Sequence, residues 1–284
     1  DVSAAAGTYT TLNTDAHWSF AQFGLRIIAT QANDDVQSFV LGSSSEFADL
    51  AGSPPDAAYV TVVGEFVMLS GLTANPFRIQ WSAISDPTGW TAGTNQSDFQ
   101  DLPDGGIVRN AVGGDLAIIM QDQAIRRMTY APGSAVIFQI DRIGKDIGLL
   151  HPLALTSGGG LIFFLSTRGF MQTDTNGNMV PIGLEKVDRT FLGLYDNGAP
   201  QFTLAAVDPR SHIVLFTGRT AGMVSEAFDF AFAYHWILQR WAPVTVSGEY
   251  IASLARPGLT IEGLDALAPG AMSVIGTASN GGPD

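Results

Sequence analysis

A strand–turn–strand unit that recurs at nearly constant spacing constrains the fold of this chain more than any other feature. In each copy a short apolar strand leads through a turn into a second, bulkier strand, and the turns are marked by Gly24, Gly64, Gly114, Gly159 and Pro209. These markers lie 40, 50, 45 and 50 residues apart. That period is typical of a four-stranded β-propeller blade, which is about 40–50 residues long. Because one blade cannot bury its own apolar faces, blades have to stack around a common axis.

The later copies carry further strand patterns after the first hairpin. They lie at residues 79–84, 125–130, 170–174, 228–233 and 234–241. Helical periodicity is nearly absent, and only residues 33–50 suggest a short helical turn, capped by the serines at 43–45. The sequence therefore predicts an all-β, β-propeller-like ring of antiparallel strands that forms a single domain over residues 1–284. It predicts five or six blades, depending on how the segment after Tyr250 closes the ring, and an array of β-sandwiches remains the alternative fold.

Composition excludes several classes of protein. Hydrophobic residues make up 46% of the 284 residues and charged residues only 14%, which is not the composition of a disordered chain. So few charges suggest that part of the surface contacts partners. The net charge of −13 argues against a basic nucleic-acid groove. There is no cysteine, which excludes disulfides and thiolate chemistry, and no apolar run approaches the roughly 20 residues of a membrane-spanning helix.

A propeller can carry an active site, so enzyme motifs need a test. Residues 85–90 resemble the repeated Ser-x-Asp-x-Gly-x-Thr-Trp turn of sialidases, but with the wrong spacing and only once. Glycoside hydrolysis needs two carboxylates at a set distance. The available pairs are Asp34 with Asp35, Asp101 with Asp104, and Asp141 with Asp146. All lie near Gly, Pro or Asn, where Asp is a common turn residue, so we predict no catalytic residue and no enzymatic activity.

No metal or cofactor site is predicted. The four histidines, His17, His151, His212 and His235, show no metal-ligand spacing. The run that begins at Asp174 partly resembles a Ca²⁺ loop, but Met179 stands where that loop needs glycine. A hairpin turn is expected there instead, and residues 157–160 are interpreted as a blade turn because they lack the lysine of a phosphate loop. The basic doublet Arg126–Arg127 is expected on a solvated strand face.

Two stretches carry a more specific pattern. Residues 78–90 read Arg-Ile-Gln-Trp-Ser-Ala-Ile-Ser-Asp-Pro-Thr-Gly-Trp, and residues 231–241 end in Gln-Arg-Trp. Together with residues 124–130 and 144–148 they resemble the tail nozzle or hub proteins of short-tailed bacteriophages, also called tail tubular protein B or packaged-DNA stabilisation protein. The resemblance covers about residues 10–250. It assigns a structural role to seven residues: Trp81, Asp86, Pro87, Trp90, Trp236, Arg240 and Trp241.

The resemblance implies a structural protein of the virion tail. Its homo-oligomer, a ring of six copies, would extend the channel below the portal and adaptor for DNA retention and ejection. Its partners would be further copies of itself, the adaptor and portal-side proteins, tail fibres, and viral DNA that passes through the lumen without sequence-specific binding. Family members are longer, so we expect flanking segments to be missing here. Because phosphates are repelled by acidic groups, we expect Asp and Glu to line the lumen.

Two other functions remain open at the level of sequence. One is a carbohydrate-binding or glycan-processing β-propeller, which requires exposed aromatic side chains at a rim pocket. The other is a cell-surface propeller that serves as an interaction platform.

Overall fold

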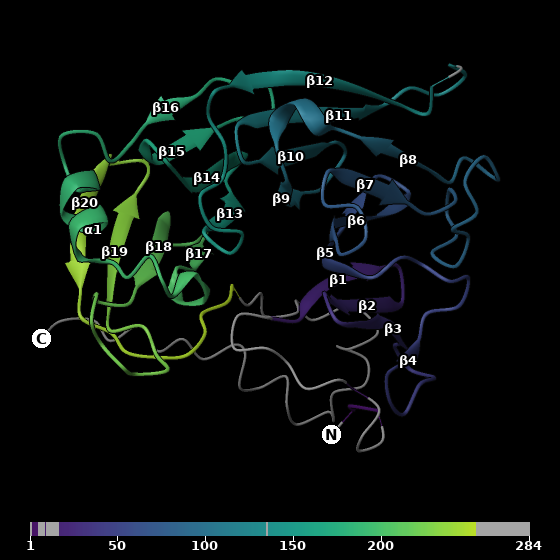
Figure 1. Ribbon diagram of the computed structural model, residues 1–284, viewed down its shortest axis with the longest axis horizontal. Coiled ribbons are helices and arrows are strands. Elements are labelled where there is room, and N and C mark those ends of the chain that lie inside the picture. Colours follow the sequence, from purple (N-terminus) through teal and green to yellow (C-terminus); the bar gives the residue numbers. More distant parts are fainter. Residues whose placement is uncertain (1, 5–8, 10–16, 135, 254–284) are drawn as a thin grey trace, which may run out of the picture. The chain divides into compact units, whose positions relative to one another are not determined.

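The computed structural model describes residues 2–4, 9, 17–134 and 136–253. The chain divides into two compact units, Asp1–Ala252 and Ser253–Asp284, and every helix and strand named below lies in the first. This unit contains five four-stranded antiparallel sheets, each built from strands that are consecutive in sequence (Figure 1). The prediction of an all-β, β-propeller-like fold is therefore confirmed.

The five sheets are numbered in chain order. Sheet 1 contains β1 (Ser19–Phe23), β2 (Arg26–Gln31), β3 (Asp34–Val40) and β4 (Ala48–Asp49). Sheet 2 contains β5 (Ala57–Val63), β6 (Phe66–Leu72), β7 (Arg78–Trp81) and β8 (Asp98–Asp101). Sheet 3 contains β9 (Val108–Val112), β10 (Ala117–Gln121), β11 (Ala124–Tyr130) and β12 (Phe138–Lys145). Sheet 4 contains β13 (Leu155–Gly158), β14 (Leu161–Ser166), β15 (Gly169–Thr173) and β16 (Val180–Pro181). Sheet 5 contains β17 (Ala205–Asp208), β18 (Ile213–Gly218), β19 (Phe230–His235) and β20 (Arg240–Val244). Three short helices lie between strands: η1 (Pro103–Gly105), α1 (Asp188–Leu194) and η2 (Pro200–Phe202).

The turn markers found in the sequence all lie between the first and second strand of a sheet. Gly24 and Gly64 occupy two-residue hairpin turns and have φ values of 59° and 54°. Glycine adopts this left-handed conformation without the steric cost that a Cβ atom adds. Pro209 follows β17 directly, in the connection to β18. The regular spacing in the sequence is thus the spacing of the sheets.

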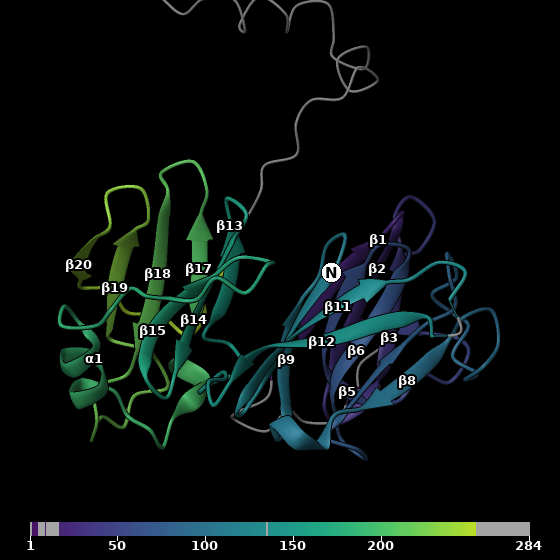
Figure 2. The ribbon, with the colours of Figure 1, turned by 90° about the horizontal axis from the view of Figure 1, so that it is seen from above.

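The first strands of successive sheets contact one another in chain order, from β1 through β5, β9 and β13 to β17. In Figure 2 the strands of sheet 5, β17, β18, β19 and β20, lie side by side in sequence order. Among the described residues no comparable contact joins β17 back to β1, so the sheets are not closed into a ring. After β20 the Tyr250 ring lies 5.5 Å from that of His17, which precedes β1. Five blades are therefore described, and residues 254–284 of the predicted closing segment lie outside the described part.

Apolar clusters fill the spaces between neighbouring sheets. Sheets 2 and 3 bury Phe66, Trp81 and Phe138 between them. Sheets 4 and 5 bury Phe163 and Tyr234 in a cluster that also includes Phe191 of α1. Two smaller clusters join sheet 1 to sheet 2 and sheet 3 to sheet 4. Since each buried aromatic or aliphatic side chain contributes roughly 1.5–3 kcal/mol, these clusters hold the sheets together.

Three local predictions were wrong. Residues 33–50 are not a helical passage: residues 34–40 and 48–49 form β3 and β4, which pair with β2 and β3, and only the short turn between them, where Ser43 N and Ser44 N donate to Val40 O, agrees with the expectation. Arg126 does not lie on a solvated face: it is buried, and its Nε donates to Gln121 Oε1 at 2.7 Å. Four of the carboxylates that were expected in turns lie within strands instead: Asp34 and Asp35 in β3, Asp101 in β8, and Asp141 in β12 beside Arg127. Helix α1 was not predicted at all.

Candidate functional site

The two faces of sheet 1 differ in what covers them. Side chains alternate between the faces of a strand, and Ala21, Phe23 and Ile28 point toward sheet 2, where they join the apolar cluster. The opposite face, here called the outer aromatic face, carries Phe20, Ala29, Gln37, Phe39 and Phe47. Phe47 connects its aromatic side chains, because its ring centroid lies 5.4 Å from that of Phe39 and 6.5 Å from that of Phe20.

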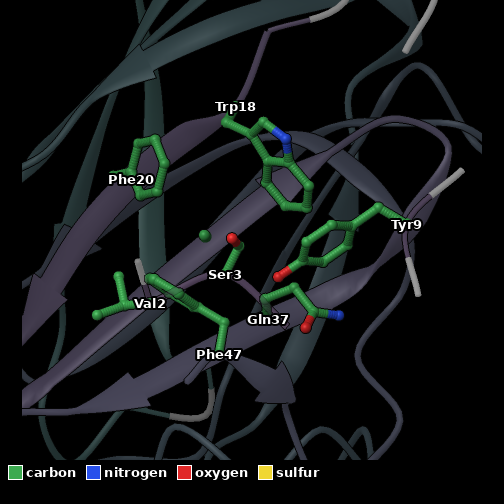
Figure 3. Close-up of a pocket in the computed structure, with 8 residues that line it drawn as sticks. Val2, Ser3, Tyr9, Trp18, Phe20, Gln37 and Phe47 are labelled. Atoms are coloured by element: carbon green, nitrogen blue, oxygen red, sulfur yellow. The ribbon is translucent and has the colours of Figure 1, made fainter. Parts of the chain in front are cut away.

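A pocket of about 290 Å³ lies on the outer aromatic face (Figure 3). Residues near the N-terminus supply one wall, and Phe20, Ala29, Gln37 and Phe47 supply the other. The main chain of this N-terminal segment is tied to the sheet, since Phe47 N donates to Val2 O at 2.9 Å. Tyr9 and Trp18 meet edge to face at a centroid distance of 5.2 Å. The pocket therefore offers several aromatic rings and few polar groups.

Gln37 is the polar group of greatest interest in this pocket. Its side chain is buried, and its Nε2 donates to Asp49 Oδ1 at 2.6 Å and to Asp35 O at 3.0 Å. These two bonds fix the orientation of the amide, and its Oε1 has no hydrogen-bond donor among the described residues. A buried acceptor without a partner is costly, which sets Gln37 apart from the other residues that line this pocket.

The first group of motif residues lies in sheet 2. Trp81 ends β7 and is buried, with its ring 5.0 Å from that of Phe138 and its Nε1 donating to Gln96 O at 2.8 Å. Trp90 is buried on the other side of the sheet, facing sheet 1, and its Nε1 donates to Pro87 O at 2.8 Å. Asp86 accepts hydrogen bonds from Thr88, which lower the pKa of its carboxyl group. This arrangement shapes a turn and supplies core packing.

The second group lies in sheet 5. Trp236 is buried, 5.4 Å from Phe163 of sheet 4 between ring centroids. Trp241 is half-buried, 4.8 Å from Tyr234, and its Nε1 donates to Ile182 O at 2.8 Å. Arg240 is exposed at the start of β20. The structure does not bring the two groups together around one pocket.

Three of the six candidate carboxylates, those of Asp101, Asp104 and Asp141, are paired with arginines. Asp101 accepts from Arg78 at 2.6 Å, and Asp104 accepts from Arg126 and also lies 3.4 Å from Arg142. These hydrogen bonds lower the pKa values of Asp101 and Asp104 below the usual range. A general acid needs the opposite shift, so these groups are not suited to that role.

The loop that partly resembled a Ca²⁺ site is a turn, and its aspartate accepts hydrogen bonds from the backbone of that turn. Asp174 Oδ1 accepts from the backbone nitrogens of Asn176 and Asn178, as expected for a turn between β15 and β16. Within the described ranges, no group of three or more His, Cys, Asp or Glu side chains is arranged to hold a metal ion. In the same part of the chain, no helix has both the length and the apolar character needed to cross a membrane.

The outer aromatic face was missed at the level of sequence. Its signal is the alternation in β1 and β3, where Phe20 and Phe39 occupy the positions that face away from sheet 2. Which of the two faces of such a strand is left uncovered depends on the order of the sheets, and short-range spacing does not contain that information.

No family model and no curated protein matches this chain. Among solved structures it is similar to Hsv2 from the Kluyveromyces species marxianus and lactis, at 8% and 9% identity and TM-scores of 0.44 and 0.43. These matches cover 77% of this chain and 60% and 58% of the respective structures. It is also similar to the dihydro-heme d1 dehydrogenase NirN in complex with DHE, at 11% identity, a TM-score of 0.48, and coverage of 82% and 47%. The chain thus spans about half to three fifths of the length of these structures.

Proposed function

We propose that this chain is a non-enzymatic structural module that associates with further copies of itself in the tail nozzle of a short-tailed bacteriophage. The observation that carries the assembly role is the outer aromatic face. It lies on sheet 1, at one end of a row of five sheets that does not close into a ring among the described residues. The phage tail assignment is supported by the sequence patterns at residues 78–90 and 231–241. The tryptophans of those patterns serve packing, which fits a structural role.

Exposure of the outer aromatic face supports association. Phe20 is 60% exposed, and Leu25 and Leu41 in the adjoining turns are 69% and 38% exposed. Exposed apolar side chains gathered on one part of a surface can form an interaction site. In the proposed assembly the outer aromatic face of one copy contacts a different surface of the next copy. Such head-to-tail contacts generate a ring when the rotation that relates successive copies brings the last copy back to the first.

Immunogold labelling of virions tests the location. Antibodies raised against the purified chain are applied to phage particles from its source, and the gold is located by electron microscopy. The proposal expects gold at the distal end of the tail axis. Particles that carry the protein elsewhere, or not at all, would remove the nozzle assignment and leave the self-association of the purified chain to be judged separately.

Carbohydrate binding is the second candidate, and the pocket on the outer aromatic face favours it. Aromatic rings stack on the apolar faces of sugars, and the unpartnered Gln37 Oε1 can accept a hydrogen bond from a sugar hydroxyl. A glycan array probed with the wild-type chain and with Gln37→Leu tests this function. Specific glycan signals that Gln37→Leu removes would support it, and an empty array for the wild-type chain would exclude it for the glycans displayed.

A further inference from the structure

A second, more polar pocket lies where the first strands of sheets 2 and 3 meet the segments that lead into sheets 4 and 5. It has a volume of about 410 Å³, and its polar lining consists of Tyr59, Arg109, His151, Asn197 and Gln201. It shares no lining residue with the pocket on the outer aromatic face. Its residues come from four different parts of the chain that only the fold brings together.

Two buried polar atoms in the lining residues of this pocket have no partner among the described residues. They are His151 Nε2 and Gln201 Oε1, on side chains that are 6% and 9% exposed. Buried polar groups are nearly always hydrogen-bonded, and each exception requires an explanation. Burial, with a contribution from Arg109, lowers the pKa of His151 to about 4. The imidazole is therefore neutral near pH 7, with one donor and one acceptor nitrogen.

Arg109 provides the only positive charge among the residues that line this pocket. Its Nε donates to Asp122 Oδ1, while its two terminal nitrogens have no acceptor in the part of the chain that the structure describes. Burial also raises the pKa of Tyr59 to about 12, which keeps its hydroxyl protonated as a donor. The guanidinium thus already has one carboxylate partner, Asp122, and its two remaining nitrogens, on a pocket whose other polar lining residues are neutral, are suited to bind one further carboxylate.

We propose that this pocket binds a small hydroxylated organic acid of the sugar-acid type. The carboxylate lies against the free nitrogens of Arg109, and the hydroxyls of the ligand satisfy His151 Nε2 and Gln201 Oε1. The size of the pocket supports an organic ligand rather than a bare anion, because small-molecule sites are typically about 300–1,000 Å³. The site does not depend on the proposed association of copies, since no residue of the outer aromatic face contributes to it.

Isothermal titration calorimetry of the full chain tests the site with D-glucuronate, D-glucose and inorganic phosphate as separate probes. D-glucuronate is expected to saturate one site, and D-glucose, which lacks the carboxylate, to bind roughly tenfold more weakly or not at all. Saturation by phosphate without binding of D-glucuronate would overturn the proposal, because it would show an adventitious anion only. The absence of saturation by any probe would overturn it as well.

Three variants locate the binding in this pocket. Arg109→Gln is expected to weaken D-glucuronate binding roughly tenfold. The matched control Arg78→Gln, which removes an ion-paired arginine on sheet 2, should leave binding unchanged. Gln201→Met removes the unpartnered oxygen, so it should weaken binding while leaving the melting temperature of the ligand-free chain unchanged or raised. Equal losses for both arginine variants, or a folded Gln201→Met that binds like wild type, would contradict the assignment.

Discussion

The interface between sheets 2 and 3 and the outer aromatic face of sheet 1 are both apolar, but the first is buried throughout, whereas the second is only partly covered and leaves Phe20 exposed. At the interface, Phe66, Trp81 and Phe138 pack as a three-ring cluster, with Trp81 4% exposed. On the outer aromatic face, Phe20 packs against Phe47 and is 60% exposed. The comparison separates two uses of the same residue type, because an aromatic side chain that stabilises the fold is buried, whereas one available to a partner is exposed.

The largest expected effect is on the covered side of this comparison. Trp81→Ala removes a large buried ring and the hydrogen bond of its indole nitrogen to Gln96 O. We expect the free energy of unfolding to fall by roughly 3–5 kcal/mol, as for other aromatic truncations in cores. Urea denaturation followed by circular dichroism measures this change. A loss below about 1 kcal/mol would contradict the core position of Trp81.

His151 should make the free energy of unfolding depend on pH, which the buried and exposed aromatic side chains do not. The pKa of His151 is lowered to about 4 in the folded chain, against about 6.5 when unfolded. Between these values the unfolded chain binds more protons, so stability is full above pH 6.5 and is lost as the pH falls toward 4. The loss is on the order of 3 kcal/mol. Stability curves of wild type and His151→Phe from pH 7 to 4 measure it, and parallel curves would refute this assignment.

Breaking the ion pair between Arg126 and Asp104 should lower the free energy of unfolding by less than the protonation of His151 does, and at a more acidic pH. Hydrogen bonding to Arg126 lowers the pKa of Asp104, so this contribution is present above the unfolded value of about 3.8 and is lost as the pH falls through the folded value. Arg126→Met should therefore flatten the acid limb of the stability curve. It should also leave Gln121 Oε1 without the Arg126 donor, at a cost of about 1–3 kcal/mol. An acid limb identical to that of wild type would show that this pair does not contribute.

The smallest effect on stability is expected at the exposed part of the outer aromatic face. Phe20→Lys changes a side chain that is 60% exposed, so the free energy of unfolding should change by less than about 0.5 kcal/mol. Measured beside Trp81→Ala under the same conditions, it gives the sharpest contrast between the two regions. A loss similar to that of Trp81→Ala would show that Phe20 belongs to the core.

The sequence was sufficient to predict the sheets because their signal is local and repeated. Gly24, Gly64, Gly114 and Gly159 adopt positive φ in the first turn of each of the first four sheets, and that requirement is visible as regularly spaced glycine. The functional surfaces were not predictable in the same way. Gln37 becomes significant because its oxygen is buried without a donor. The same holds for buried ion pairs outside these surfaces, since Arg126 is buried beside Asp104, which lies 22 residues away and accepts its hydrogen bond. Both properties depend on contacts between separate strands and loops, which short-range spacing does not show.

The most direct test of the central claim is the mass distribution of the purified chain, measured by mass photometry for wild type, Phe20→Lys and Ile237→Lys. Ile237 is 63% exposed in the turn between β19 and β20 and serves as the matched control. The account predicts a wild-type oligomer that Phe20→Lys dissociates and Ile237→Lys leaves intact. A monomeric wild type, or an oligomer that Phe20→Lys does not change, would contradict association through the outer aromatic face.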